Sequence, residues 1–152
     1  MTTHPRSLLV LLSALFALGG CAVLTGPDEP DPVAGEVAEQ MRKWEAQGLD
    51  DYRFTLARTC FCTEEATQPA RVEVRDDRVV RVTSIRTGRA LSLELGVTVE
   101  AMFEQIAVAA RDGTYLEAAY HPERGYPAQV VIGTLANDAG VGYSLSDLEA
   151  VR

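Results

Sequence analysis

The chain has 152 residues, with 14 basic and 22 acidic side chains and a formal net charge of −8. This length suits one domain with one hydrophobic core. An acidic balance is unfavourable for binding nucleic acids or anionic lipid surfaces, so we expect no nucleic-acid partner.

Residues 1–20 have the features of a bacterial export signal. Arg6 supplies a positive charge, no acidic residue occurs before Cys21, and Leu8–Leu18 is an apolar run. As a helix this run would rise only about 16 Å, too short for the ~30 Å hydrocarbon core of a membrane. The run ends in Leu18–Cys21, which reads Leu-Gly-Gly-Cys and has the pattern of a lipobox.

The lipobox predicts cleavage before Cys21 and attachment of lipid to that cysteine. Three acyl chains would hold the protein firmly, whereas one chain binds a membrane only marginally. We therefore expect a lipid-anchored protein on the extracytoplasmic side of a bacterial membrane, in the cell envelope. The alternative is an ordinary secretory signal followed by an incidental cysteine.

Residues 21–34 are predicted to be a tether. Gly26–Pro32 contains three prolines and three acidic residues, a composition that opposes both helix and sheet. Proline-rich chain extends by about 3.1 Å per residue, so the tether would lift the next segment roughly 40 Å from the membrane. Residues 35–152 are predicted to form a single α+β domain.

The first half of this domain is predicted to be a helix followed by three strands. A helix over residues 36–47 has Val37, Met41 and Trp44 on one face. The later elements are a strand beginning at Tyr52, a second at Val72–Val74, a turn at Asp76-Asp77, a third strand from Arg78 to Ile85, and a further strand or packed loop at Leu91, Leu93 and Leu95.

The second half repeats this order. Thr98 is predicted to cap a helix over residues 98–112, with Val97 packed on Met102. The remaining expected features are a buried helix face of Met102, Phe103, Ile106, Ala107 and Ala110, strands over 114–120 and 128–135, turns at His121–Gly125 and Asn137–Gly140, and a last strand with Val141, Tyr143 and Leu145. The fold class is α+β: an antiparallel β-sheet of about six strands with two helices on one face, in the order α-β-β-β-α-β-β-β.

Cys60 and Cys62 are the only chemically suggestive pair. Thiols outside the cytoplasm tend to be oxidised, and with Cys21 lipidated these two remain as an even pair. Residues two apart on a straight strand lie at the edge of disulfide reach, and a bend at Phe61 would close the bond. A structural disulfide, an intermolecular or metal-linked pair of thiols, and a redox-active pair are all compatible with this spacing.

Other chemistry has little support in the sequence. A zinc site would need Cys60, Cys62, His121 and one acidic residue to converge. His121 is instead expected in a solvated turn, and the acidic pairs Glu64-Glu65 and Asp76-Asp77 also have the pattern of turns. No nucleophile motif, phosphate loop or dinucleotide motif is present, so we expect no metal, no cofactor and no catalytic residues.

Several motifs resemble a family of small bacterial lipoproteins of unknown function, domain of unknown function 6174. They are Tyr52–Thr55, Arg58, Cys60–Cys62 and Gly125–Pro127 before the apolar Val130–Ile132. The resemblance covers about residues 40–146 and implies an envelope location and a fold style, but no activity.

Two functions follow as hypotheses. The first is a non-catalytic binding or scaffold module, tethered to the membrane, whose partner is an envelope protein or ligand. The second is an envelope thiol-redox factor that uses Cys60 and Cys62. An inert, fully oxidised pair of cysteines would favour the first hypothesis, and a pair that cycles at about −200 mV would favour the second.

Overall fold

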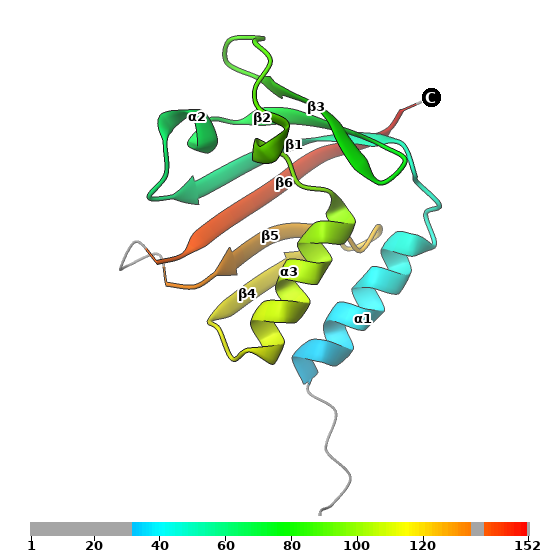
Figure 1. Cartoon of the computed structure of the whole chain (residues 1–152). Coiled ribbons are helices and arrows are strands. Elements are labelled where there is room, and N and C mark those ends of the chain that lie inside the picture. Colours follow the sequence, from blue (N-terminus) through cyan, green and yellow to red (C-terminus); the bar gives the residue numbers. More distant parts are fainter. Residues whose placement is uncertain (1–31, 135–138, 152) are drawn as a thin grey trace, which may run out of the picture.

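The computed structural model describes residues 32–134 and 139–151. They form one antiparallel sheet with helices packed against it, which confirms the α+β class (Figure 1). The helices are α1 (Pro32–Glu45), α2 (Glu64–Thr67) and α3 (Val99–Arg111), with a 3-10 turn η1 (Leu93–Leu95). The strands are β1 (Tyr52–Cys60), β2 (Ala70–Arg75), β3 (Arg78–Ser84), β4 (Leu116–Tyr120), β5 (Pro127–Ile132) and β6 (Val141–Ala150).

The six strands lie in the order β3-β2-β1-β6-β5-β4. Every neighbouring pair is antiparallel. The first strand and the last therefore lie side by side in the middle of the sheet, as Figure 1 shows for the cyan-green β1 and the red β6. The expected order α-β-β-β-α-β-β-β is met except for the short α2 and η1, which interrupt it.

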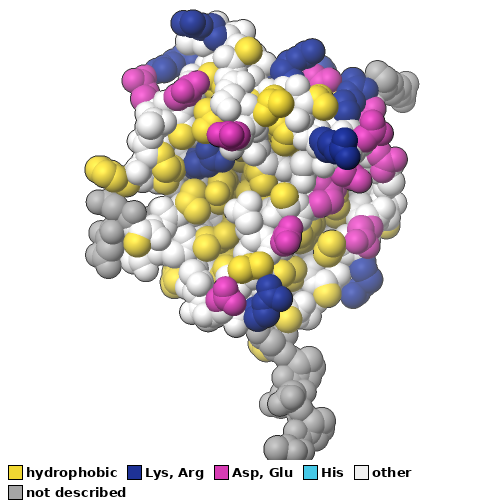
Figure 2. All heavy atoms as spheres, in the orientation of Figure 1, with side chains coloured by type: hydrophobic (Ala, Val, Ile, Leu, Met, Phe, Trp, Pro, Cys, Tyr) yellow, Lys and Arg dark blue, Asp and Glu magenta, His cyan; other side chains and the backbone are white. Residues whose placement is uncertain are grey.

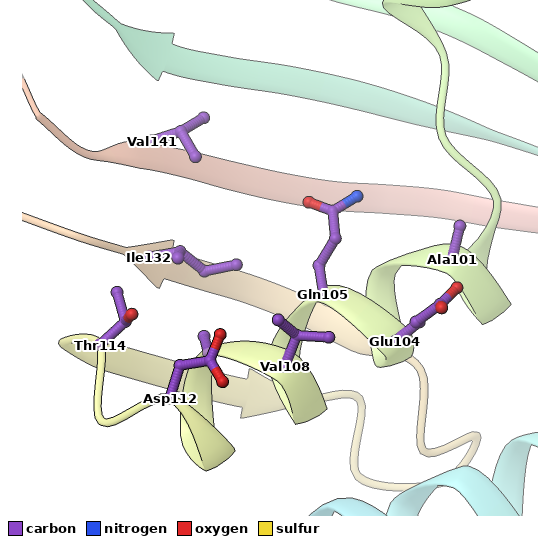
Figure 3. Close-up of a pocket in the computed structure, with 9 residues that line it drawn as sticks. Ala101, Glu104, Gln105, Val108, Asp112, Thr114, Ile132 and Val141 are labelled. Atoms are coloured by element: carbon purple, nitrogen blue, oxygen red, sulfur yellow. The ribbon is translucent and has the colours of Figure 1, made fainter.

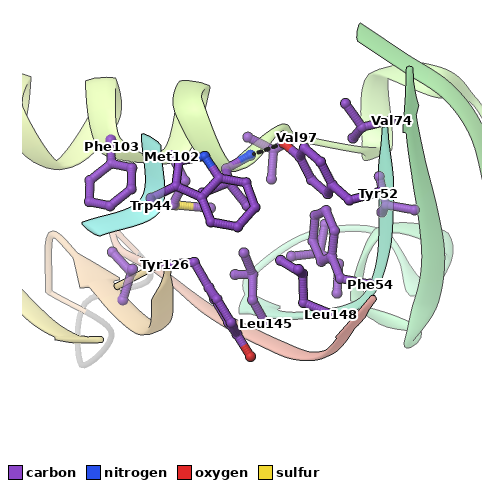
Figure 4. Packing of buried hydrophobic residues seen from close by; sticks show 14 of the residues in the cluster. Trp44, Tyr52, Phe54, Val74, Val97, Met102, Phe103, Tyr126, Leu145 and Leu148 are labelled. Atoms are coloured by element: carbon purple, nitrogen blue, oxygen red, sulfur yellow. Dashed lines mark hydrogen bonds between the residues drawn. The ribbon is translucent and has the colours of Figure 1, made fainter. Parts of the chain in front are cut away.

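The core lies between the sheet and the helices, and alternation in β1 explains one side of it. Tyr52, Phe54 and Leu56 are almost completely buried, while the residues between them are half-buried or exposed. A strand places alternate side chains on opposite faces, so these three point together towards the helices. Figure 4 shows Tyr52 and Phe54 among the side chains of this core.

Helix α3 begins as the sequence predicts. The hydroxyl of Thr98 accepts a hydrogen bond from the backbone N–H of Ala101, and both Val97 and Met102 are buried. The expected buried face is partly wrong. It consists of Val99, Met102, Phe103, Ile106 and Ala109, whereas Ala107 is exposed and Ala110 is half-buried. The helix is rotated so that the stripe containing Met102, Ile106 and Ala109 faces the core.

Helix α1 begins at Pro32, inside the stretch that the sequence assigns to the tether. Proline is tolerated in the first turn of a helix, where its missing N–H has no intrahelical partner. Val37 and Trp44 are buried as expected, but Met41 is 37% exposed. The predicted three-residue stripe is therefore too wide, and only a narrow part of α1 faces the core.

The two main helices meet the sheet differently. Helix α3 packs over β4 and β5, whereas α1 packs against α3 (Figure 1). Helix α1 also rests on the turn after β4, where Gly125 has φ +77° and lies so close that an added Cβ would be 2.5 Å from the carbonyl oxygen of Gln40. Only glycine fits this position without a shift. The expectation of two helices packed on one face of the sheet is thus met in part.

The turns match the sequence better than the strand ends do. Asp76 and Asp77 both have left-handed backbone angles, and they join β2 to β3. Strand β5 ends at Ile132 rather than at residue 135, because Gly133 turns the chain at φ +77°. Residues 91–95 form a packed loop with a 3-10 turn, and Leu93 is half exposed. The predicted turn residues Asn137 and Asp138 lie outside the described residues.

Candidate functional site

A groove of about 420 Å³ lies between α3 and the adjoining ends of β5 and β6. Figure 3 shows Ile132 and Val141 on the sheet side of this groove, with Gln105 extending from α3 towards β6. We call it the α3 groove. Its lining residues are Ala101, Glu104, Gln105, Val108, Ala109, Asp112, Thr114, Ile132 and Val141.

The α3 groove has an apolar floor and a polar, solvent-exposed rim. Ile132, Val141 and Ala101 are half-buried, whereas Glu104 on α3 and Asp112 just after it are exposed. Figure 2 shows hydrophobic side chains gathered on this face, with acidic groups near their border. An apolar surface bordered by a few polar groups is the usual character of a binding site.

Arg58 lies on the same face of the sheet, on β1, beside the groove rather than in its lining, and its side chain lines a small neighbouring cavity with Glu65 and Leu95. Arg58 on β1 lies opposite Tyr143 on β6. Two residues further along β1, the next pair on the same face is Cys60 opposite Val141. The guanidinium carbon of Arg58 is 5.3 Å from the centre of the Tyr143 ring, within cation–π range. The same group donates to the carbonyl oxygens of Ala66, at 3.5 Å, and Leu95, at 3.3 Å.

Arg58 has no acidic partner among the residues that the structure describes. Its side chain is half-buried, so water screens its charge less than at the surface. Arg75, in contrast, pairs with both Asp51 and Glu73 on the other face of the sheet. The face with the groove therefore carries a cation that forms no ion pair within the described part of the chain.

Cys60 and Cys62 form a disulfide at the end of β1, with their Cα atoms 5.3 Å apart. Of the three arrangements that the spacing allows, the structure contains the intramolecular bond. Cys60 is half-buried beside Val141, Cys62 is exposed, and Phe61 between them is 84% exposed. The bond therefore lies at the edge of the face that carries the α3 groove.

Glu100 is the centre of a polar network that the sequence does not reveal. Its two carboxylate oxygens accept from Trp44 Nε1 at 2.5 Å and from the Tyr52 hydroxyl at 2.7 Å. The Tyr52 oxygen accepts in turn from the backbone N–H of Val99 at 2.9 Å, the dashed line in Figure 4. Burial, with Glu100 adding to it, raises the pKa of Tyr52, so the hydroxyl keeps the proton it donates. The network joins α1, β1 and α3 and is structural.

His121 lies in the turn after β4, as expected, but it is half-buried rather than solvated. Its ring stacks on Tyr126, and Nδ1 accepts from the N–H groups of Glu123 and Arg124. Over residues 32–134 and 139–151, no three His, Cys, Asp or Glu side chains are placed to hold a metal ion. Within the same ranges, no helix has the length and apolarity needed to cross a membrane. Cys21 lies outside the described residues.

The fold and the groove together define an α+β domain with one six-stranded antiparallel sheet and an apolar cleft beside its second long helix. The chain belongs to the Family of unknown function (DUF6174), whose model matches residues 36–150. This match includes every strand and α3, and the motifs at Tyr52–Thr55, Cys60–Cys62 and Gly125–Pro127 lie within it, which confirms the membership in this domain of unknown function. A search of the curated proteins found no match.

Proposed function

We propose that the protein is a lipoprotein of the cell envelope, and that its domain is a non-catalytic binding module that uses the α3 groove. The observation that carries this proposal is the groove itself, whose apolar floor lies on the same face as Arg58, a half-buried cation without an acidic partner among the residues that the structure describes. An apolar floor in contact with water and a half-buried cation without an anion are both unfavourable in the free protein. A ligand that covers them would supply the apolar contact and the opposite charge.

Site-specific photo-crosslinking in living cells tests the binding module. A photoreactive amino acid at Val108, on the rim of the groove, should give discrete adducts with an envelope component. The same amino acid at Arg81, on β3 and 68% exposed, is the matched control and should give none. Identical adducts from both positions, or none from Val108, would contradict the proposal.

Lipid attachment at Cys21 is the second part of the proposal, and it rests on the Leu-Gly-Gly-Cys pattern after an apolar run. Intact-mass analysis of protein extracted from membranes should show an N-terminus at Cys21 that carries a diacylglyceryl group. The Cys21→Ala variant should lose this mass and leave the membrane fraction. A soluble product cleaved elsewhere, or a membrane-bound Cys21→Ala variant, would show that the anchor is something else.

A thiol-redox function is the second candidate, and it is favoured by the exposure of Cys62 at the end of a disulfide. In such a reaction a partner dithiol would attack the bond, passing two electrons and two protons to Cys60 and Cys62 and itself becoming a disulfide. Redox titration separates the candidates. A pair that exchanges with glutathione at about −200 mV supports redox work, whereas a pair that stays oxidised supports the binding module.

The disulfide should persist in freshly exported protein, because the compartment is oxidising and the two cysteines are only two residues apart, at and just after the end of β1. Non-reducing peptide mapping should recover one peptide with Cys60 bonded to Cys62. Reduction should loosen the end of β1 and lower the free energy of unfolding by no more than about 2 kcal/mol, because the closed loop is very short. Two free, alkylatable thiols would contradict the bond, and a cross-linked dimer would indicate assembly.

A further inference from the structure

We propose that the α3 groove binds the C-terminal end of a polypeptide. The terminal carboxylate would pair with Arg58, and the last apolar side chain would lie over Ile132 and Val141. This inference rests on the proposed function, since it names the kind of ligand that the groove takes. Four observations lead to it: the unpaired charge, the strand register, a free amide in the groove and the open rim.

The unpaired charge of Arg58 favours an anionic ligand. A guanidinium group has five N–H donors, and that of Arg58 donates two hydrogen bonds to carbonyl oxygens, at 3.3 and 3.5 Å. Donors therefore remain for a carboxylate, which arginine holds with charge-assisted hydrogen bonds. Glu104 and Asp112 are exposed on the rim, so water can solvate their charges without a partner. The half-buried cation is the group that gains most from a partner.

The register of the strands determines how far the backbone of Arg58 lies from the apolar floor of the groove. Arg58 lies opposite Tyr143, and Val141, two residues along β6, lies opposite Ile132. Residues two apart on a strand are separated by about 6.5 Å, and neighbouring strands by about 5 Å. By these spacings the backbone of Val141 lies about 8 Å from that of Arg58, and the backbone of Ile132, one strand further, lies about 12 Å away. About two to four extended residues span this separation, so a chain whose carboxylate is at Arg58 can place one of its last side chains over the floor.

Gln105 supplies a contact suited to a peptide backbone. Its amide has no hydrogen-bond partner among the described residues, and it extends from α3 across the groove towards β6 (Figure 3). A side-chain amide both donates and accepts, so it matches the N–H and C=O of a main chain.

The shape of the groove favours a chain over a small molecule. Glu104, Val108, Asp112 and Thr114 on its rim are all exposed, so the groove stays open to solvent along α3. Sites for small molecules bury most of the ligand surface, whereas an open groove lets the rest of a polypeptide leave into water. The acidic rim would also disfavour a ligand with further acidic residues.

Fluorescence anisotropy tests the inference on the full chain in detergent micelles. The probe is a fluorescein-labelled hexapeptide, Gly-Ser-Gly-Ser-Leu-Val, with a free carboxylate, and its partner is the same peptide with a C-terminal amide. The free acid should bind the native chain about tenfold tighter or more than the amide, because a charge-assisted contact is lost in the amide. This comparison needs no mutation, so it does not depend on how a variant folds.

Variants assign the effect to residues. Arg58→Gln should abolish the tenfold preference, Arg58→Lys should keep part of it, and Arg81→Gln, a control on the other face, should leave it unchanged. Ile132→Ser should weaken both peptides alike. Equal binding of acid and amide, a preference that survives Arg58→Gln, or no binding of either peptide overturns this inference. The proposed function survives that result if the adducts at Val108 form, and it fails separately if they do not.

Discussion

Replacing Trp44 with alanine is expected to lower the free energy of unfolding by about 3–5 kcal/mol. Its side chain is 3% exposed, and it packs edge-on against Tyr52, with ring centres 5.1 Å apart, and against Tyr126, at 6.3 Å. Together with Val37 it attaches α1 to the core, and Figure 4 shows it among the core side chains. The substitution therefore leaves a large cavity and weakens the attachment of a whole helix.

Urea denaturation followed by tyrosine fluorescence and circular dichroism measures this loss. The matched control is Met41→Ala, on the same helix but 37% exposed, and it should cost less than about 1 kcal/mol. A loss below 1 kcal/mol for Trp44→Ala would place the indole at the surface and contradict the packing of α1.

Glu100→Ala is expected to cost about 2–4 kcal/mol, although Glu100 belongs to a helix end where such a change is usually mild. Its carboxylate accepts hydrogen bonds from Trp44 Nε1 and the Tyr52 hydroxyl, and both rings are buried. Leaving a buried donor unsatisfied costs about 1–3 kcal/mol each. The loss should reach both donors at once, because they belong to one network.

Two further variants separate this network from the general effect of removing a charge. Glu100→Gln keeps one carbonyl oxygen as acceptor and should cost clearly less than Glu100→Ala. Glu104→Ala, one turn further along α3 and exposed, should change the free energy of unfolding by less than about 0.5 kcal/mol. Equal losses from Glu100→Ala and Glu104→Ala would show that the hydrogen bonds contribute nothing measurable.

Local signals in the sequence predict most of the individual elements. Alternation in Tyr52–Leu56 predicts β1, Thr98 predicts the start of α3, and the Asp76-Asp77 pair predicts the turn between β2 and β3. These features depend on neighbours in the chain. Pro32 leads to a wrong prediction of where the tether ends and α1 begins. Proline disrupts the interior of a helix but is accepted in its first turn.

Features that depend on distant partners are not visible in the sequence. The alternation of β6 changes phase near Asp147, whose φ is +54°, and this bulge brings Leu148 as well as Leu145 into the core. The strand order is equally hidden, since no local pattern places β6 beside β1. Alternation of apolar and polar residues along a strand predicts which side chains point to the core, but not which strand lies beside it.

The candidate site divides in the same way. The proximity of Cys60 and Cys62 follows from a separation of two residues. The α3 groove cannot be predicted from such a local pattern. It combines Ile132 and Val141, on paired strands, with residues of a helix 20 or more positions earlier in the chain. Likewise, no local pattern shows that Arg58 lacks an acidic partner among residues 32–134 and 139–151. That becomes evident only when the surrounding elements are in place.

The central position of β6 has a consequence for the timing of folding. β1, β2 and β3 form one half of the sheet, β4 and β5 form the other, and only β6 joins them. A chain made from its N-terminus therefore cannot complete its core until the last strand has been synthesised, and the pairing of β1 with β6 spans more than 80 residues. Closure of the sheet is therefore a late step that depends on the ten residues of β6.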